Sequence, residues 1–180
     1  MSSSAELQLL RHDHARALLV FERENRDYFA ASIPDRGDDY FAQFDARHRE
    51  RLSEQAAGLL YFHVLVDNGE VLGRVNLVDV AEGSAELGYR IAEKAAGRGL
   101  ATRAVHQVCA MAASEYGLTT LRARTTLDNA GSRAVLTRTG FVSAGETILS
   151  GRPGLRYTRN LDQGAVSFRP RDGEQKNGMP

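Results

Sequence analysis

The chain has 180 residues, of which 42% are hydrophobic and 26% charged, a composition typical of one soluble globular domain. Its 23 Lys and Arg residues balance 23 Asp and Glu residues, so the net charge gives no argument for nucleic acid or an acidic membrane surface as a partner. Cys109 is the single cysteine, which excludes an intramolecular disulfide and a cysteine-rich zinc site. No apolar run approaches the ~20 residues that cross a bilayer, and no secretory signal is visible, so we expect a cytoplasmic protein.

The first half of the chain predicts two helices and a β-hairpin. Apolar periodicity and turn residues predict helices over residues 12–31 and 38–57 and strands over residues 6–10, 59–66 and 71–80. Pro34 and Gly37 separate the two helices. Asn68 and Gly69 lie between two apolar runs, and Asn-Gly is the strongest short hairpin signal.

The second half alternates strands with helices. A glycine-bearing loop precedes a long helix, a short helix follows the next strand, and strands are predicted over residues 85–91, 119–126, 141–149 and 155–160. The last two strands are expected to turn at Arg152-Pro153-Gly154. Hairpins followed by a helix-connected strand pair imply one α+β domain with a mixed, mostly antiparallel sheet and flanking helices. We assign residues 1–162 to this domain and expect the polar tail, residues 163–180, to be disordered.

The loop from Ala95 to Ala101 is expected to bind a phosphorylated cofactor. Gly97 and Gly99 allow close approach of the backbone to an anion, and the helix that follows offers unpaired N–H groups and the positive end of its dipole. A P-loop would need Lys followed by Ser or Thr after the last glycine, so ATP or GTP binding by that route is excluded. The loop is also an incomplete dinucleotide fingerprint, with Thr102 at the third glycine position, which leaves a nucleotide-binding oxidoreductase as a distant third hypothesis.

The loop and a downstream segment resemble the GNAT superfamily of N-acetyltransferases, which use acetyl-CoA. The glycine and small-residue positions of the family's loop fall on Gly97, Gly99 and Ala101, while Ala96 replaces the usual Arg or Gln. Residues 129–141 resemble the superfamily's second motif. The segments most similar to the RimJ/RimL-type ribosomal-protein N-acetyltransferases are residues 24–29 ahead of Ile33-Pro34, residues 85–89, and Asn129 with Ser132. The resemblance covers roughly residues 7–161 and implies transfer of an acetyl group to a primary amine, either a protein N-terminal α-amine or a small amine.

The resemblance also implies where acetyl-CoA would bind. The strand before the loop would splay from the next strand, and pantetheine amides would pair with backbone groups of Tyr89, Arg90 and Ile91 as an added strand does. The remaining expected cofactor contacts are Gly97, Arg98, Gly99, Leu100, Ala101, Thr102, Asn129 and Ser132. Arg98 is the favoured side chain for the coenzyme's phosphates because it lies within the loop. The other arginines considered, which also fit solvated helix faces, are Arg103, Arg133 and Arg138.

Glu86 and Ser132 are the candidate catalytic residues. The attacking amine must be neutral, and Glu86 on the strand before the loop is the candidate general base, with a carboxylate that merely pairs with an arginine as the alternative. Water could also serve, because an α-amine with a pKa of about 8 is already about a tenth neutral at pH 7. Many family members place a tyrosine acid where this chain has Leu136, so Ser132 is expected to assist the departing thiolate, unless it only packs the start of its helix. Asn129 is a candidate N-cap of that helix.

The sequence constrains the acceptor and the remaining hypotheses less tightly than it constrains the cofactor site. Asp35, Asp38 and Asp39 lie in the segment that borders the acceptor site in the family, where they would either attract a cationic amine or cap a surface helix. The departures at Ala96 and Leu136 keep open a second hypothesis, a non-catalytic acyl-CoA-binding sensor or scaffold. No metal is expected, because two ligands on one helix, His106 and Cys109, do not make a zinc site. Monomer and homodimer both fit the sequence.

Overall fold

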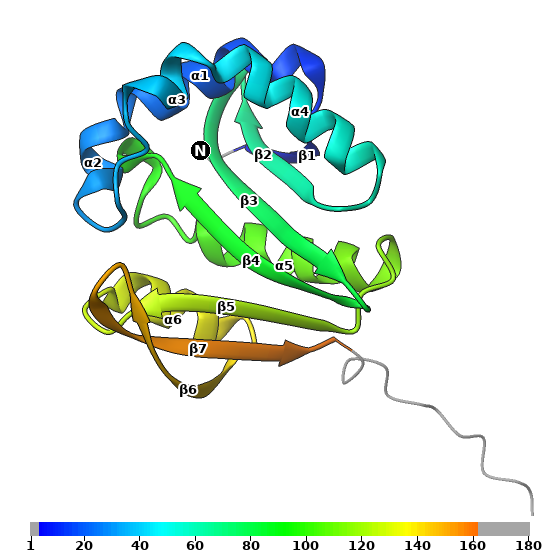
Figure 1. Cartoon of the computed structure of the whole chain (residues 1–180), viewed down its shortest axis with the longest axis vertical. Coiled ribbons are helices and arrows are strands. Elements are labelled where there is room, and N and C mark those ends of the chain that lie inside the picture. Colours follow the sequence, from blue (N-terminus) through cyan, green and yellow to red (C-terminus); the bar gives the residue numbers. More distant parts are fainter. Residues whose placement is uncertain (1–3, 162–180) are drawn as a thin grey trace, which may run out of the picture.

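The computed structural model describes residues 4–161, which form one seven-stranded sheet flanked by helices (Figure 1). The strands are β1 (Glu6–Leu9), β2 (Tyr61–Asp67), β3 (Glu70–Ala81), β4 (Ser84–Ile91), β5 (Thr120–Thr126), β6 (Val142–Leu149) and β7 (Arg152–Asn160). The helices are α1 (Ala15–Glu24), α2 (Arg26–Ala30), α3 (Asp38–Ala42), α4 (Phe44–Ala56), α5 (Leu100–Ser114) and α6 (Ala130–Arg138), with 3-10 turns over His12–His14 and Glu93–Ala95. The predicted α+β class is confirmed, and the tail 163–180 lies outside the described residues.

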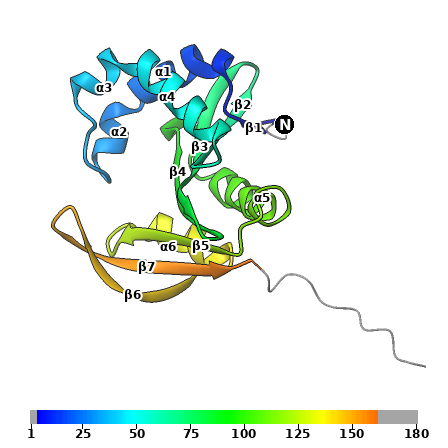
Figure 2. The ribbon, with the colours of Figure 1, turned by 45° about the vertical axis from the view of Figure 1, so that its right-hand side comes forward.

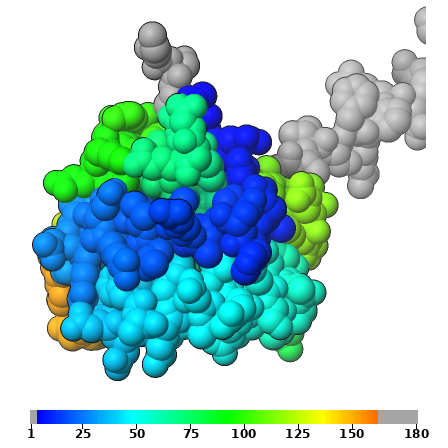
Figure 3. Space-filling view, turned by 90° about the horizontal axis from the view of Figure 1, so that it is seen from above, coloured from blue at the N-terminus to red at the C-terminus, as the bar shows by residue number. Residues whose placement is uncertain are grey.

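The strand order is β1-β2-β3-β4-β5-β7-β6, and only β4 and β5 are parallel. Helices α1–α4 cover one face of the first four strands, and α5 packs on the opposite face (Figures 1 and 2). Successive side chains of β3 therefore alternate between the two layers: Arg74 faces Glu22 of α1, whereas Val75 and Leu77 are fully buried on the α5 side. Seen from above, α1–α4 lie side by side, next to parts of the chain coloured teal and green (Figure 3).

The helix predicted over residues 12–31 is wrong in its continuity, because it breaks at Asn25. The buried Asn25 amide nitrogen donates to the carbonyl of Phe21 at 2.9 Å, and its amide oxygen accepts from the backbone N–H of Glu93 at 3.0 Å. A side chain that competes in this way for backbone groups ends α1 and ties it to the loop after β4. The helix predicted over residues 38–57 likewise breaks at Gln43, between α3 and α4. None of the helices within residues 4–161 has the length and apolar character needed to span a bilayer.

Of the two hairpin turns predicted from the sequence, one is found at the predicted residues and the other is not. The Asn68-Gly69 turn is confirmed, and both residues have the positive φ angles, 49° and 79°, that a two-residue hairpin turn of type I′ needs. The turn expected at Arg152-Pro153-Gly154 is wrong: the chain reverses at Ser150 and Gly151, with φ angles of 49° and 77°. Arg152–Gly154 instead begin β7, where the carbonyl of Pro153 accepts from the N–H of Leu127 at 3.0 Å.

The sheet divides between β4 and β5, as the family resemblance implied. These strands are paired only at Ser84–Thr120, Ala85–Leu121 and Glu86–Arg122. Beyond Glu86, β4 remains paired with β3 as far as Ile91, and β5 remains paired with β7 as far as Thr126. The two halves of the sheet therefore separate towards the carboxyl ends of β4 and β5 (Figure 2).

Candidate active site

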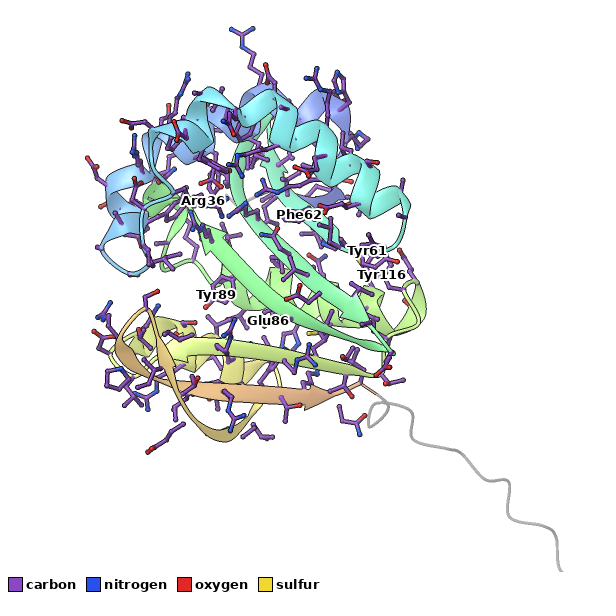
Figure 4. All side chains as sticks on the ribbon, viewed as in Figure 1. Arg36, Tyr61, Phe62, Glu86, Tyr89 and Tyr116 are labelled. Atoms are coloured by element: carbon purple, nitrogen blue, oxygen red, sulfur yellow. The ribbon has the colours of Figure 1, made fainter. Side chains whose placement is uncertain are left out.

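Two neighbouring pockets lie at the division of the sheet. The larger pocket, about 550 Å³, is bounded by β3, β4, β5, the loop between α2 and α3, and the β6–β7 turn. The loop pocket, about 340 Å³, lies towards the N-terminus of α5. Both are lined by Ser32, Ile33, Tyr89, Arg90, Asn129 and Ser132. Figure 4 shows Glu86 and Tyr89 along the edge of β4, with Arg36 above them.

The loop pocket brings together the expected cofactor residues apart from Arg98. It is lined by Tyr89, Arg90, Ile91, Gly97, Gly99, Leu100, Ala101, Thr102, Asn129 and Ser132. Gly97 and Gly99 have φ angles of 75° and 73°, and a Cβ added to either would meet nothing within 4 Å. The N-terminus of α5 has no side-chain cap and no acidic residue in its first turn. Because its first N–H groups lack intrahelical partners, this open, glycine-lined end fits the diphosphate of coenzyme A.

The four candidate arginines make different contacts. The guanidinium of Arg98 folds back to the carbonyl of Lys94 at 2.7 Å. Arg103 donates to the carbonyl of Ala5 at 3.4 Å, and Arg133 to that of Leu127 at 2.9 Å. Arg138 is the one among the four that lines the loop pocket. It comes from the last turn of α6, a position that sequence spacing relative to the glycine loop does not reveal.

Asn129 and Ser132 join β5 and α6 at the junction of the two pockets. The side-chain oxygen of Asn129 accepts from the backbone N–H of Ser132 at 3.1 Å, which makes Asn129 the N-cap of α6, as its position predicts. The Ser132 side chain lies near the phenol of Tyr89, and both residues line the two pockets. Burial raises the pKa of Tyr89, and interaction with the Ser132 side chain offsets this in part, so the phenol remains protonated at neutral pH. Only the backbone of Tyr89 was expected to contact the cofactor, so its phenol is a candidate functional group that sequence reasoning missed.

Glu86 lies where β4 and β5 part, and its carboxylate lines the larger pocket. Its Oε1 accepts from Nε of Arg124 at 2.8 Å, and the two side chains are 23% and 48% exposed. The carboxylate is therefore both accessible to an acceptor and paired with an arginine. This geometry is compatible with a general base and with the ion pair that was its alternative. Leu136, at the position of the family's tyrosine acid, is buried against the same pocket.

A buried charge cluster forms one wall of the larger pocket and was missed by sequence reasoning. Glu22 of α1 contacts Arg74 at 3.1 Å and Arg90 at 3.3 Å, and the side chains of Glu22 and Arg74 are 2% and 3% exposed. Burial lowers the pKa of Arg74 to about 9, which still leaves the guanidinium charged at pH 7. Arg90 also lies over the ring of Phe29, 5.1 Å from its centroid.

The aspartates expected near the acceptor are engaged elsewhere. Arg26 pairs with both Asp35 and Asp38 at 2.8 Å, and its hydrogen bond lowers the pKa of Asp35 to about 2. Asp38 and Asp39 lie in the first turn of α3, and the larger pocket is lined by none of the three. None of the three aspartates caps α3, because its N-cap is Gly37 and no side chain makes a cap hydrogen bond there. Within residues 4–161 there is no group of three or more His, Cys, Asp or Glu side chains that could hold a metal ion.

Comparison with known families gives one match, to the acetyltransferase (GNAT) domain, over residues 6–142. This match spans most of the chain, including the glycine loop, Glu86 and the start of α6. A comparison with curated protein sequences gives no match.

Solved structures with the same fold include three ribosomal-protein-type acetyltransferases. A ribosomal-protein alanine acetyltransferase from Vibrio fischeri has a TM-score of 0.84 and 20% identity, covering 92% of this chain and 96% of that one. A RimL α-N-protein acetyltransferase in complex with coenzyme A has a TM-score of 0.80 and 19% identity, covering 89% and 96%. RimJ from Mycobacterium smegmatis, in complex with a coenzyme A disulfide, has a TM-score of 0.76 and 22% identity, covering 88% and 83%.

Proposed function

The chain belongs to the GNAT acetyltransferase family, and on this premise we propose that it acetylates a protein N-terminal α-amine or a small amine, with acetyl-CoA as the acetyl donor. The observation that carries the proposal is the division between β4 and β5, which joins the uncapped glycine loop of α5 to a second pocket holding Glu86. Acetyl-CoA would enter through the loop pocket and the acceptor through the larger pocket, and the two would meet where the pockets join.

The chain would hold the donor through backbone groups. The N–H groups at the start of α5 and the Arg138 side chain would bind the phosphates. The edge of β4 beyond Glu86 has no β5 partner, so its backbone groups are available to pair with the pantetheine amides as an added strand would. Acetyl-CoA supplies the activated acetyl thioester, and this placement would bring it to the junction lined by Tyr89 and Ser132.

Proton transfer would use residues on both sides of that junction. Glu86 would accept the proton of the attacking amine directly or through water, with Arg124 orienting its carboxylate. Tyr89 and Ser132, which lie near each other at the junction of the two pockets, would deliver a proton to the departing thiolate in place of the tyrosine that is absent at Leu136. A coenzyme A thiolate is a tolerable leaving group, so the loss of this second transfer would slow turnover without abolishing it.

Thermal shift and thiol release together test the proposal. Acetyl-CoA and coenzyme A should raise the Tm, whereas NAD and ATP should not, because binding to the native state alone stabilises it. Thiol release should then depend on an added amine, tested with N-terminal peptides and small amines. Binding of acetyl-CoA without amine-dependent thiol release across the panel would instead support the sensor or scaffold alternative. Stabilisation by NAD or ATP but not by acetyl-CoA would contradict both.

A further inference from the structure

The larger pocket carries an excess of positive charge. Its lining includes one carboxylate, Glu86, and five arginines, Arg36, Arg74, Arg90, Arg124 and Arg152. Three carboxylates balance them in part: Glu86 pairs with Arg124, Asp128 with Arg152, and Glu22 is shared between Arg74 and Arg90. Two positive charges remain at the end of the pocket formed by β3, β4 and the α2–α3 loop.

Several buried polar atoms at that end lack partners among the described residues. Nη1 of Arg74 has no hydrogen-bond partner, although the side chain is only 3% exposed, and Oδ1 of Asn76 also has none. Because an unsatisfied buried polar group costs free energy, such atoms call for a ligand or ordered water. Arg36 forms no ion pair within residues 4–161 and lies over the ring of Tyr40, 4.6 Å from its centroid. Figure 4 shows Arg36 above Glu86 and Tyr89, on the side where the sheet opens.

The strand register connects this arginine cluster to the candidate base. Arg74 is paired with Arg90, and Asn76 with Gly88, while Glu86 follows two residues beyond Gly88 on the same face. The four residue steps from Glu86 to Arg90 span about 13 Å along the strand, and the long arginine side chains shorten the distance between the charged groups. A Cβ on Gly88 would meet nothing within 4 Å, so the surface of β4 between Glu86 and the arginine cluster is open.

We propose that Arg36, Arg74 and Arg90 form an anion subsite, and that the acceptor carries a carboxylate or phosphate group a few bonds from its reactive amine. This inference rests on the proposed function and specifies the acceptor's chemistry. The anion would lie against the guanidinium groups, the chain of the acceptor would cross Gly88, and its amine would reach Glu86. Guanidinium groups suit this task because they bind carboxylate and phosphate through paired, charge-assisted hydrogen bonds.

Matched acceptors test the inference and identify the source of the anion. The three pairs are a peptide with aspartate or asparagine at its second residue, free serine and serinamide, and phosphoethanolamine and ethanolamine. In at least one pair, kcat/KM for the anionic member should be higher by about tenfold or more. Replacement of Arg36 by Gln should reduce that preference. Replacement of Arg49 by Gln, an exposed position on α4 away from the pocket, removes the same charge and should not. Equal or better rates for the neutral member of every pair would overturn the subsite.

A binding measurement separates this inference from the proposed function. Inorganic phosphate is titrated in a thermal shift assay with coenzyme A at saturation, so that the glycine loop is already occupied. Phosphate should stabilise the wild-type protein, and Arg36→Gln should weaken phosphate binding about tenfold while Arg49→Gln does not. No stabilisation by phosphate, or equal stabilisation of the Arg36→Gln variant, would overturn the subsite whatever the turnover. If no amine is acetylated, the proposed function fails and the phosphate titration alone decides on the subsite.

Discussion

At the scale of single residues, Glu86 has the two properties that a general base in this pocket needs. Its carboxylate faces the larger pocket, and its contact with Arg124 fixes the orientation of one oxygen. The ion pair is partly exposed, and pairs of this kind contribute only about 0–1 kcal/mol to stability. A large effect of substitution on the rate would therefore reflect chemistry and not folding.

Replacement of Glu86 by Gln should lower kcat by about 10²-fold or more near pH 7, because the loss of a general base typically costs this much. The deficit should shrink at high pH, where the amine acceptor is already neutral. A pH–rate profile from a thiol-release assay measures this. Arg124→Gln keeps the carboxylate but removes the group that orients it, so it should lower kcat less than Glu86→Gln does. If both variants have nearly wild-type rates at pH 7, Glu86 is only a strand carboxylate and water is the base.

Substitutions of Gly88 test whether the acceptor crosses this residue, because they add side-chain volume without changing the charge. Its backbone is not left-handed, and an added Cβ has open space, so Gly88→Val should fold normally in a strand that favours β-branched residues. The valine should raise the KM of the acceptor by about tenfold and leave the KM of acetyl-CoA unchanged, with Gly88→Ala giving a smaller increase. Steady-state kinetics with each substrate varied in turn would show this. An unchanged acceptor KM for Gly88→Val would place the acceptor elsewhere.

At the scale of secondary structure, the start of α6 connects the fold to the site. Asn129 caps this helix through the N–H of Ser132, and the Ser132 side chain lies near the phenol of Tyr89. The cap therefore sets the position of the hydroxyl that would deliver a proton to the thiolate. Stability and turnover should both respond to its removal.

Replacement of Asn129 by Ala should lower the free energy of unfolding by about 1 kcal/mol, the usual contribution of an N-cap. Because Ser132 loses its anchor, kcat should also fall. Asn129→Asp retains an acceptor oxygen and should restore the stability and most of the rate. Chemical denaturation and thiol release measure the two effects, and an Ala variant as stable and as active as the wild type would contradict the assigned cap.

The elements that sequence located best are those whose signals are local. Asn68-Gly69 defines its turn by its own φ preferences, and Gly97 and Gly99 locate the cofactor loop in the same way. The break at Asn25 was missed because the amide bonds to Glu93, 68 residues away, which no local pattern encodes. The Pro-Gly signal in β7 was misleading because Ser150 and Gly151 already make the turn. The same limit hid the arginine cluster, whose residues converge only when α1 packs on β3 and β4.

At the scale of the whole molecule, His63 couples stability to pH. It is fully buried, its Nδ1 lies 3.1 Å from the carbonyl of Val75, and its Nε2 lies 2.6 Å from the hydroxyl of Tyr116. A carbonyl can only accept, so Nδ1 donates, and Nε2 of the neutral ring accepts from Tyr116. Burial lowers the pKa of His63 to about 4 and raises that of Tyr116 to about 12, which favours the neutral ring and the protonated phenol.

The stability should consequently fall as the pH drops from about 6.5 to about 4. In this window the unfolded chain binds a proton that the folded chain excludes, so the stabilisation from neutral His63 is complete above pH 6.5 and lost below pH 4. The total is about 3 kcal/mol, and the lowered pKa values of His14 and His48, caused mainly by burial, act in the same direction. Urea unfolding at several pH values checks this against His63→Phe, which should show a shallower slope. Equal slopes in the two proteins would contradict the assignment.

The central claim, that the divided sheet brings acetyl-CoA and an amine together for acetyl transfer, is tested most directly by following the acetyl group itself. The purified chain is incubated with acetyl-CoA labelled with deuterium in its acetyl group and with the amine panel, and the products are analysed by mass spectrometry. The account predicts that the label appears on the amine of at least one acceptor in amounts equal to the thiol released. Acetyl-CoA that binds but leaves every acceptor unlabelled would contradict it.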